Sequence, residues 1–208
     1  MQTAINFIAV SSVALGIAAC GNAKDASKSN FSNAIQAYLD TQKGLCAAIP
    51  AKDFPFTVSS RDFFGSQKIK QADALVDAGL LTKRSTEVKS AFGNKVETAT
   101  EYQVTAAGNK FFVANGANTV GEHGAFCTGK YTVVEVDNFT QPSDTMGVKL
   151  SRVTYRYKVD GADSWAKLEV MRTSYDNFAE QAQGDIPGKA TVILTHDGWV
   201  HEHLFKGG

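Results

Sequence analysis

The sequence predicts an α+β protein with a helical first half and an antiparallel sheet of about five strands in its second half. Two features predict this order. Apolar residues in the first half recur at the spacing of a helix face, whereas β-branched and aromatic residues in the second half alternate with polar ones. Turn-forming residues separate the later runs, as is typical of antiparallel strands.

The N-terminal segment differs from the rest of the chain because it is almost entirely apolar. The run from Ile5 to Ala19 contains no charged residue. It is too short for a membrane span, which takes about 20 apolar residues. Such a run is typical of a secretory signal peptide, although the positive residues that usually precede it are missing here. We therefore expect residues 1–19 to be removed as a signal peptide.

The end of this segment, Ile17-Ala18-Ala19-Cys20, resembles the lipobox of bacterial lipoproteins. The resemblance implies cleavage before Cys20, a diacylglyceryl group on its sulfur and an acyl chain such as palmitate on its amino group. Two or more acyl chains hold a protein stably on a membrane. An Asp after the cysteine retains such lipoproteins in the inner membrane, so Gly21 favours the outer membrane, facing the periplasm. The alternatives are an ordinary signal peptide with a chance cysteine, or a buried apolar helix.

Small polar residues follow, and we expect residues 20–30 to be the acylated cysteine and a flexible tether. Residues 31–118 are then expected to form a helical region. The apolar positions from Phe31 to Ile49 predict a helix that Pro50 ends. Those from Ile69 to Leu80 predict a second helix.

Residues 68–113 resemble a winged-helix module. The stretch Ala74-Leu75-Val76-Asp77-Ala78-Gly79-Leu80-Leu81 is followed by a polar hairpin and by Tyr102-Gln103-Val104-Thr105-Ala106-Ala107-Gly108. The resemblance implies a helix with two wing strands, and a first half that is winged-helix-like. Some winged helices bind DNA, but this chain has 21 basic and 21 acidic residues, and phosphate binding needs a net positive surface. We therefore expect no nucleic acid partner.

Residues 119–208 are expected to form the antiparallel β region. In its longest run Val153, Tyr155 and Tyr157 alternate with polar residues, which indicates a strand with one face on the core and one in water. Asp197-Gly198 predicts a hairpin between the last two strands. The expected strands are 130–137, 148–159, 165–173, 190–196 and 199–205.

The remaining two cysteines, Cys46 on the first predicted helix and Cys127 at the opening of the β region, form an even pair once Cys20 is acylated. In an oxidising compartment such a pair is expected to form a disulfide bond. The bond would then join the helical half to the sheet. The alternative is two free thiols, each buried as a small apolar residue.

Histidines give one candidate metal site. His201 and His203 are two residues apart on a predicted strand and so share a face, while His196 lies across the hairpin. Two imidazoles with a third ligand could bind zinc or copper. The alternative is an exposed polar face without a metal.

A second candidate surface is a basic stripe. Arg152, Arg156 and Lys158 recur at the spacing of one strand face. This stripe could bind an anionic glycan, a lipid head group or an acidic patch on a protein. The alternative is a solvated sheet face, since charged residues are common on exposed strands.

The sequence contains no phosphate-binding Gly-rich loop, nucleophile elbow or HExxH helix, so we assign no catalytic residue and no cofactor. The predicted function is that of an envelope lipoprotein, a non-catalytic binding or accessory module that faces the periplasm. Its expected partners are the membrane, through the lipid anchor, and an envelope protein, glycan or small ligand. The alternatives are a small-ligand or metal carrier that uses the sheet face and the histidines, and a hydrolase with a composite site.

Overall fold

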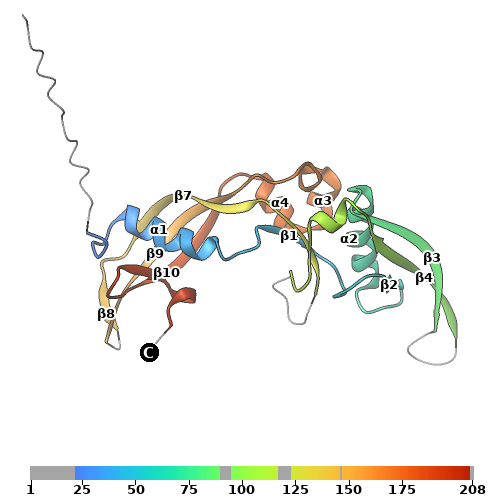
Figure 1. Cartoon of the computed structure of the whole chain (residues 1–208), viewed down its shortest axis with the longest axis horizontal. Coiled ribbons are helices and arrows are strands. Elements are labelled where there is room, and N and C mark those ends of the chain that lie inside the picture. The colour runs from blue at the N-terminus through green and yellow to red at the C-terminus, as the bar shows by residue number, and fades with distance from the viewer. Residues whose placement is uncertain (1–21, 90–94, 117–122, 146, 207–208) are drawn as a thin grey trace, which may run out of the picture.

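A computed structural model describes residues 22–89, 95–116, 123–145 and 147–206 of the chain. The molecule is elongated, with helix α1 (Lys28–Leu39) and a curled sheet at one end of its long axis and a helix with a long hairpin at the other (Figure 1). Of the described residues, 40% lie in strands and 28% in helices, so sheets determine the architecture. Among the described residues, none of the helices combines the length and the apolar character that a membrane span requires.

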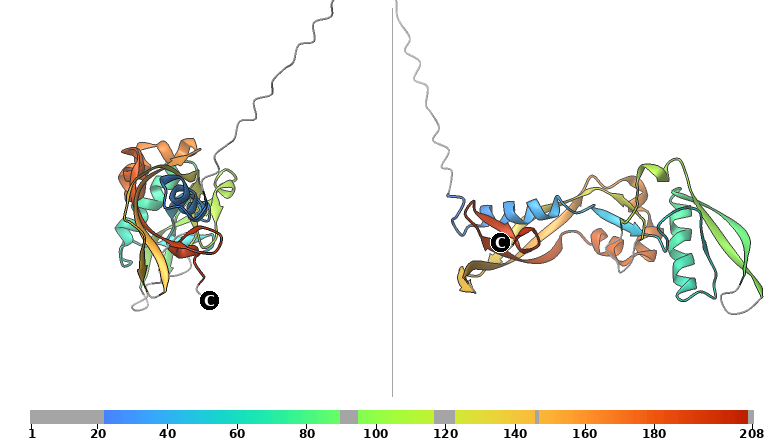
Figure 2. Two further views of the ribbon diagram at one scale, coloured as in Figure 1. Left: turned by 90° about the vertical axis from the view of Figure 1, so that its left-hand side faces the viewer. Right: turned by 60° about the horizontal axis from the view of Figure 1, so that its bottom comes forward.

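The curled sheet is a half-barrel of five antiparallel strands that wraps around α1 (Figure 2). Its strands are β7 (Lys130–Phe139), β8 (Ser143–Thr145), β9 (Val148–Asp160), β10 (Ile186–Leu194) and β11 (Trp199–His201). They lie in the order β11-β10-β9-β7, and β8 pairs with β9. Two register shifts interrupt the pairing of β7 with β9. Such bulges bend a strand and increase its twist, which favours the curl.

Alternation along β9 separates the two faces of the half-barrel. Val153 and Tyr155 are buried in one core with α1, whereas Arg152 and Thr154 are exposed on the outer face. The core-facing side of the strand is closely packed, because a Cβ atom added at Gly188 on β10 would meet the ring of Tyr155. The sequence pattern thus places one face of β9 against the helix and the other in water.

Helix α1 fills the concave face of the half-barrel. Ser27 caps its start, because the hydroxyl of Ser27 accepts a hydrogen bond from the Asn30 N–H at 3.2 Å. The helix buries Phe31, Ala34, Ile35 and Leu39. Burying a side chain as large as phenylalanine stabilises a fold by about 1.5–3 kcal/mol, so this face holds the helix in the sheet.

A glutamine of α1 also closes an edge of the sheet. The Gln36 side chain donates to the Tyr131 carbonyl at 3.0 Å and accepts from the Val133 N–H at 2.8 Å. It therefore hydrogen-bonds the free backbone edge of β7 as a neighbouring strand would.

The second core lies along the rest of the long axis, from the middle of the molecule to its far end (Figure 1). At the waist of the molecule a small sheet with the order β1-β6-β5 packs with two short helices. These elements are β1 (Leu45–Ala48), β5 (Phe112–Val113), β6 (Ala125–Thr128), α3 (Glu169–Ser174) and α4 (Asp176–Ala182). Short 3-10 turns occupy Gly108–Lys110, Ser164–Lys167 and Glu202–Leu204.

The far end of the molecule, which we call the distal module, consists of helix α2 on a three-stranded sheet with the order β2-β4-β3. Its elements are α2 (Gly65–Asp77), β2 (Phe56–Val58), β3 (Leu81–Lys89) and β4 (Val96–Val104). The fully buried Tyr102 donates its hydroxyl to Asp73 of α2 at 2.9 Å, and Asp73 also pairs with Lys83 of β3 at 2.9 Å. These contacts fix α2 on the hairpin.

The expectation of a helical, winged-helix-like first half followed by a sheet-only second half is wrong. The first half contains two α-helices and the five strands β1 to β5, and α3 and α4 lie in the second half. Each core also draws residues from both sides of residue 118. The predicted strand at 165–173 is a 3-10 turn followed by α3, because the buried Met171, Ser174 and Phe178 recur at the i, i+3 and i+7 spacing of a helix and do not alternate.

The first predicted helix is also too long, since α1 ends at Leu39 rather than Ile49. Gly44 adopts a positive φ of 76°, and a Cβ atom at this position would clash with the Gly129 carbonyl oxygen. Because glycine has no Cβ, the chain can turn here into β1, where Leu45 and Ala47 are buried. Cys46 therefore lies on a strand and not on a helix.

The disulfide bond between Cys46 and Cys127 is confirmed. The two cysteines face each other across β1 and β6, with their Cα atoms 4.1 Å apart. The bond therefore connects adjacent strands of the waist sheet, and does not join a helical half to the half-barrel as expected.

We expect the Cys46→Ala, Cys127→Ala double variant to lose about 2–4.5 kcal/mol in free energy of unfolding, because the bond closes a loop of 81 residues. Urea denaturation of the oxidised protein and the double variant measures this loss. Dithiothreitol should destabilise the parent and leave the double variant unchanged. Equal stability of the two proteins would contradict a structural role for the bond.

Candidate binding site at the waist

A cavity of about 450 Å³ opens where the two cores meet, and we call it the waist cavity. Its lining comes from the turn after α1, from β1, α2 and β7, and from the α3–α4 junction. The lining residues are Thr41, Gln42, Lys43, Gly44, Cys46, Ala48, Gln71, Gly116, Tyr131, Tyr175 and Asn177. The site is therefore assembled from segments far apart in the sequence.

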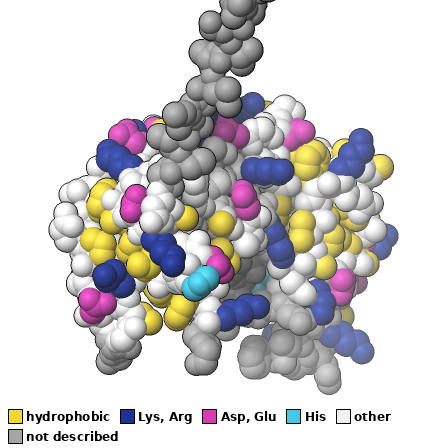
Figure 3. All heavy atoms as spheres, turned by 60° about the vertical axis from the view of Figure 1, so that its left-hand side comes forward, with side chains coloured by type: hydrophobic (Ala, Val, Ile, Leu, Met, Phe, Trp, Pro, Cys, Tyr) yellow, Lys and Arg dark blue, Asp and Glu magenta, His cyan; other side chains and the backbone are white. Residues whose placement is uncertain are grey.

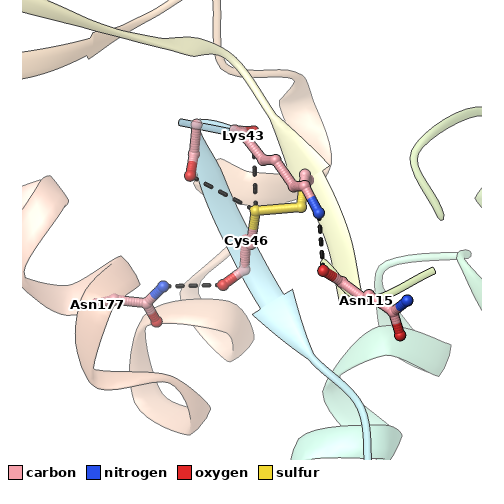
Figure 4. The surroundings of a disulfide bond; sticks show 6 residues. Lys43, Cys46, Asn115 and Asn177 are labelled. Carbon is pink, nitrogen blue, oxygen red and sulfur yellow. Dashed lines mark hydrogen bonds between the residues drawn. A yellow bond between two sulfur atoms is a disulfide. The ribbon is translucent and has the colours of Figure 1, made fainter. Parts of the chain in front are cut away.

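The disulfide bond and its neighbours hold one wall of the waist cavity in place (Figure 4). Asn177 donates from Nδ2 to the Cys46 carbonyl at 2.9 Å, which ties α4 to β1. On the other side, Lys43 Nζ donates to the Asn115 carbonyl at 2.7 Å. Backbone carbonyls of two different segments thus position the side chains of Asn177 and Lys43.

Two tyrosines complete the waist cavity. The buried Tyr175 hydroxyl lies 3.2 Å from the carbonyl oxygens of both Ala48 and Gln71, and its burial raises its pKa. Burial, with a smaller contribution from Tyr157, raises the pKa of Tyr131 to about 12. Both phenols therefore keep their protons at neutral pH, and act as hydrogen-bond donors rather than bases.

Several polar atoms of the waist cavity are left for a ligand. The Tyr131 hydroxyl has no hydrogen-bond partner among the residues that the structure describes. Three side-chain amides, those of Gln42, Gln71 and Asn177, each donate a hydrogen bond through nitrogen. Their side-chain oxygens likewise have no partner among the described residues. Lys43 is the one charged side chain in the described lining. This combination suits a polar ligand with hydroxyl or amide groups and little net charge.

The histidines are only partly brought together. The rings of His201 and His203 lie 5.3 Å apart, and His201 also stacks on Tyr38 at 4.0 Å. His196 sits at the exposed turn of the hairpin and pairs with Asp197 at 3.0 Å. Over the described parts of the chain, no group of three or more His, Cys, Asp or Glu residues is arranged to hold a metal ion.

His201 has a structural role instead. It is 2% exposed, and its Nδ1 accepts a hydrogen bond from the His203 N–H at 3.1 Å. A proton on Nδ1 would remove this acceptor. The geometry therefore requires the neutral imidazole.

The basic stripe lies on the outer face of the half-barrel, but most of it is neutralised. Arg156 contacts three carboxylates, those of Glu135 at 2.7 Å, Asp137 at 2.9 Å and Asp185 at 3.1 Å. Lys158 pairs with Asp160 at 3.0 Å.

Arg152, the third predicted member of the stripe, has no ion pair within the described ranges. It lines an outer groove of about 410 Å³ together with Lys189 and Glu202. The Glu202 carboxylate in this groove accepts from the Thr191 N–H at 3.0 Å, which caps the edge of β10. The surface that remains for an anionic partner therefore consists of two cations, Arg152 and Lys189, beside the carboxylate of Glu202.

Sequence reasoning did not find the waist cavity. Apart from Cys46, none of its lining residues belongs to a motif, and no spacing connects Lys43, Gln71 and Tyr131. Comparison with known proteins gives no match to a family model, to a curated protein or to a solved structure. The cysteine pairing was the one sequence signal that pointed to this region.

The buried His201 predicts a pH-dependent stability. Burial, and to a lesser extent His203, lowers the pKa of His201 in the folded protein, while Glu202 opposes the shift. The unfolded chain then binds a proton at higher pH than the folded one, so the free energy of unfolding falls as the pH drops below about 6.5. We expect His201→Gln to reduce this fall in urea denaturation between pH 7.5 and 5.

The matched control is His196→Gln, which changes an exposed histidine of the same hairpin and should leave the pH dependence unaltered. An unchanged pH dependence in His201→Gln would show that the buried imidazole does not contribute to it.

Proposed function

We propose that the protein is a lipid-anchored binding module of the cell envelope, attached through Cys20 to the outer membrane and facing the periplasm. The lipobox resemblance supports the anchor. The Cys46–Cys127 bond is consistent with an oxidising compartment outside the cytoplasm. The observation that carries the binding role is the waist cavity, where a wall held by the disulfide bond presents polar atoms that have no hydrogen-bond partner among the described residues.

The chemistry of the waist cavity favours binding over catalysis. No carboxylate or imidazole is among its described lining residues, and its tyrosines stay protonated at neutral pH. General acid–base catalysis needs a group whose pKa is near the working pH. The site therefore binds a polar ligand, either a small molecule or part of an envelope glycan or protein, and leaves it unchanged.

The anchor is tested by the intact mass of protein extracted from membranes. We expect a chain that begins at Cys20 and carries the added mass of its acyl chains. The Cys20→Ser variant should lose these chains and appear in the soluble fraction. A chain that retains residues 1–19 would contradict the anchor.

The binding site is tested by photo-crosslinking in native membranes. We expect benzoylphenylalanine in place of Gln42, at the rim of the waist cavity, to give a discrete adduct. The same group in place of Ser85, which is exposed on β3 of the distal module, serves as the control. Filling the cavity with Ala48→Trp should abolish the Gln42 adduct. Equal adducts at both positions, or an adduct that survives Ala48→Trp, would contradict the site.

A further inference from the structure

The chain just after the proposed anchor is fixed to the half-barrel. The indole Nε1–H of Trp199 lies 3.2 Å from the Lys24 carbonyl oxygen and 3.1 Å from that of Asp25. Trp199 is itself 8% exposed and packs edge-on against Phe31 of α1, with their ring centroids 4.8 Å apart. Residues that the sequence suggested as a tether are thus bound to a core side chain.

The turn itself is also internally bonded. Asn30 Nδ2 donates to the carbonyls of Asn22 and Asp25, each at 2.9 Å, and the Asp25 N–H donates to the Asn22 carbonyl at 2.9 Å. The turn of the β10–β11 hairpin packs beside it, because a Cβ added at Gly198 would lie 3.1 Å from the Ala23 carbonyl oxygen. The N-terminal turn and the C-terminal hairpin therefore lie side by side and form one continuous surface.

The covalent distance to the anchor is short. Cys20 precedes Asn22 by two residues, and an extended chain spans at most about 3.6 Å per residue. The lipid-bearing residue therefore lies within about 7 Å of a fixed point on the half-barrel. Only Cys20 and Gly21 therefore separate the proposed lipid from this fixed point.

We propose that the anchored protein stands with the β10–β11 hairpin end of the half-barrel against the lipid surface and the distal module pointing away from it. This inference rests on the proposed lipid anchor at Cys20. The start of α1 and the β3–β4 hairpin lie at opposite ends of the long axis (Figure 1), so a molecule that rests on its anchored end carries the distal module away from the membrane.

The charges at the anchored end do not set this orientation by themselves. With this end turned toward the viewer, basic and acidic side chains are interspersed on the visible face (Figure 3). Attraction to anionic lipids needs a cluster of basic residues. The orientation therefore follows from the anchor and the hydrogen bonds of Trp199. It also places the exposed Phe63 and Phe64 of the distal module, 81% and 68% exposed, away from the lipid surface.

Energy transfer to a membrane acceptor tests the orientation. The lipid-modified protein, purified in detergent, is reconstituted into phosphatidylcholine vesicles that contain a rhodamine-labelled lipid. A coumarin amino acid replaces either His196 at the hairpin turn or Glu87 on β3. We expect several-fold more efficient transfer from position 196 than from position 87. Equal transfer from the two positions would overturn the proposal.

The variant Trp199→Phe removes the indole donor but leaves an aromatic ring in the core. With coumarin at position 87, we expect this variant to show increased transfer, because the freed segment lets the molecule tilt. Unchanged low transfer would overturn the role of Trp199 in holding the orientation. Vesicle flotation distinguishes a failure of the anchor from a failure of the orientation. Protein that does not float with the vesicles lacks the anchor, and this result would overturn both the proposed function and the orientation.

Discussion

The packing of α1 in the concave face of the half-barrel is the interaction on which the rest of the structure depends. Phe31 is fully buried, and its ring packs edge-on against Phe139 of β7 and Trp199 of β11, at 4.8 Å in each case. The helix thereby connects the first strand of the half-barrel to the last. Gln36 adds the hydrogen bonds that the free edge of β7 would otherwise lack. Without the helix, an open and strongly curled sheet would expose its apolar face and its edge to water.

The same packing determines where the binding site lies and how it is presented. Because α1 ends at Leu39, the next residues turn at Gly44 into β1, and this turn forms part of the waist cavity. The disulfide bond then fixes β1 to β6 beside the cavity. At its other end α1 begins directly after a turn that Trp199 binds. Helix α1 thus lies between the proposed anchor, at its start, and the proposed site, after its end.

Local patterns predicted those parts of the fold that local interactions determine. The alternation in β9, the hairpin at Asp197-Gly198 and the pairing of Cys46 with Cys127 are all found in the structure. The patterns failed where tertiary contacts decide. Leu45 and Ile49 continue the helical spacing of α1, yet they belong to a segment whose buried residues alternate as in a strand. The β-branched Val170 and Thr173 suggested a strand, although packing of Met171 and Phe178 favours two short helices. The waist cavity joins distant segments, so no spacing in the sequence reveals it.

The most direct test of this account is whether α1 and the half-barrel form one cooperative unit. Native-state hydrogen–deuterium exchange measures this, because amides that open only in the same unfolding event share one free energy of opening. If they form one unit, we expect the central amides of α1 to be as strongly protected as those of β9 and β10. Fast exchange throughout α1, with β9 and β10 still protected, would contradict it, since the helix would then be an addition to a sheet that is stable without it.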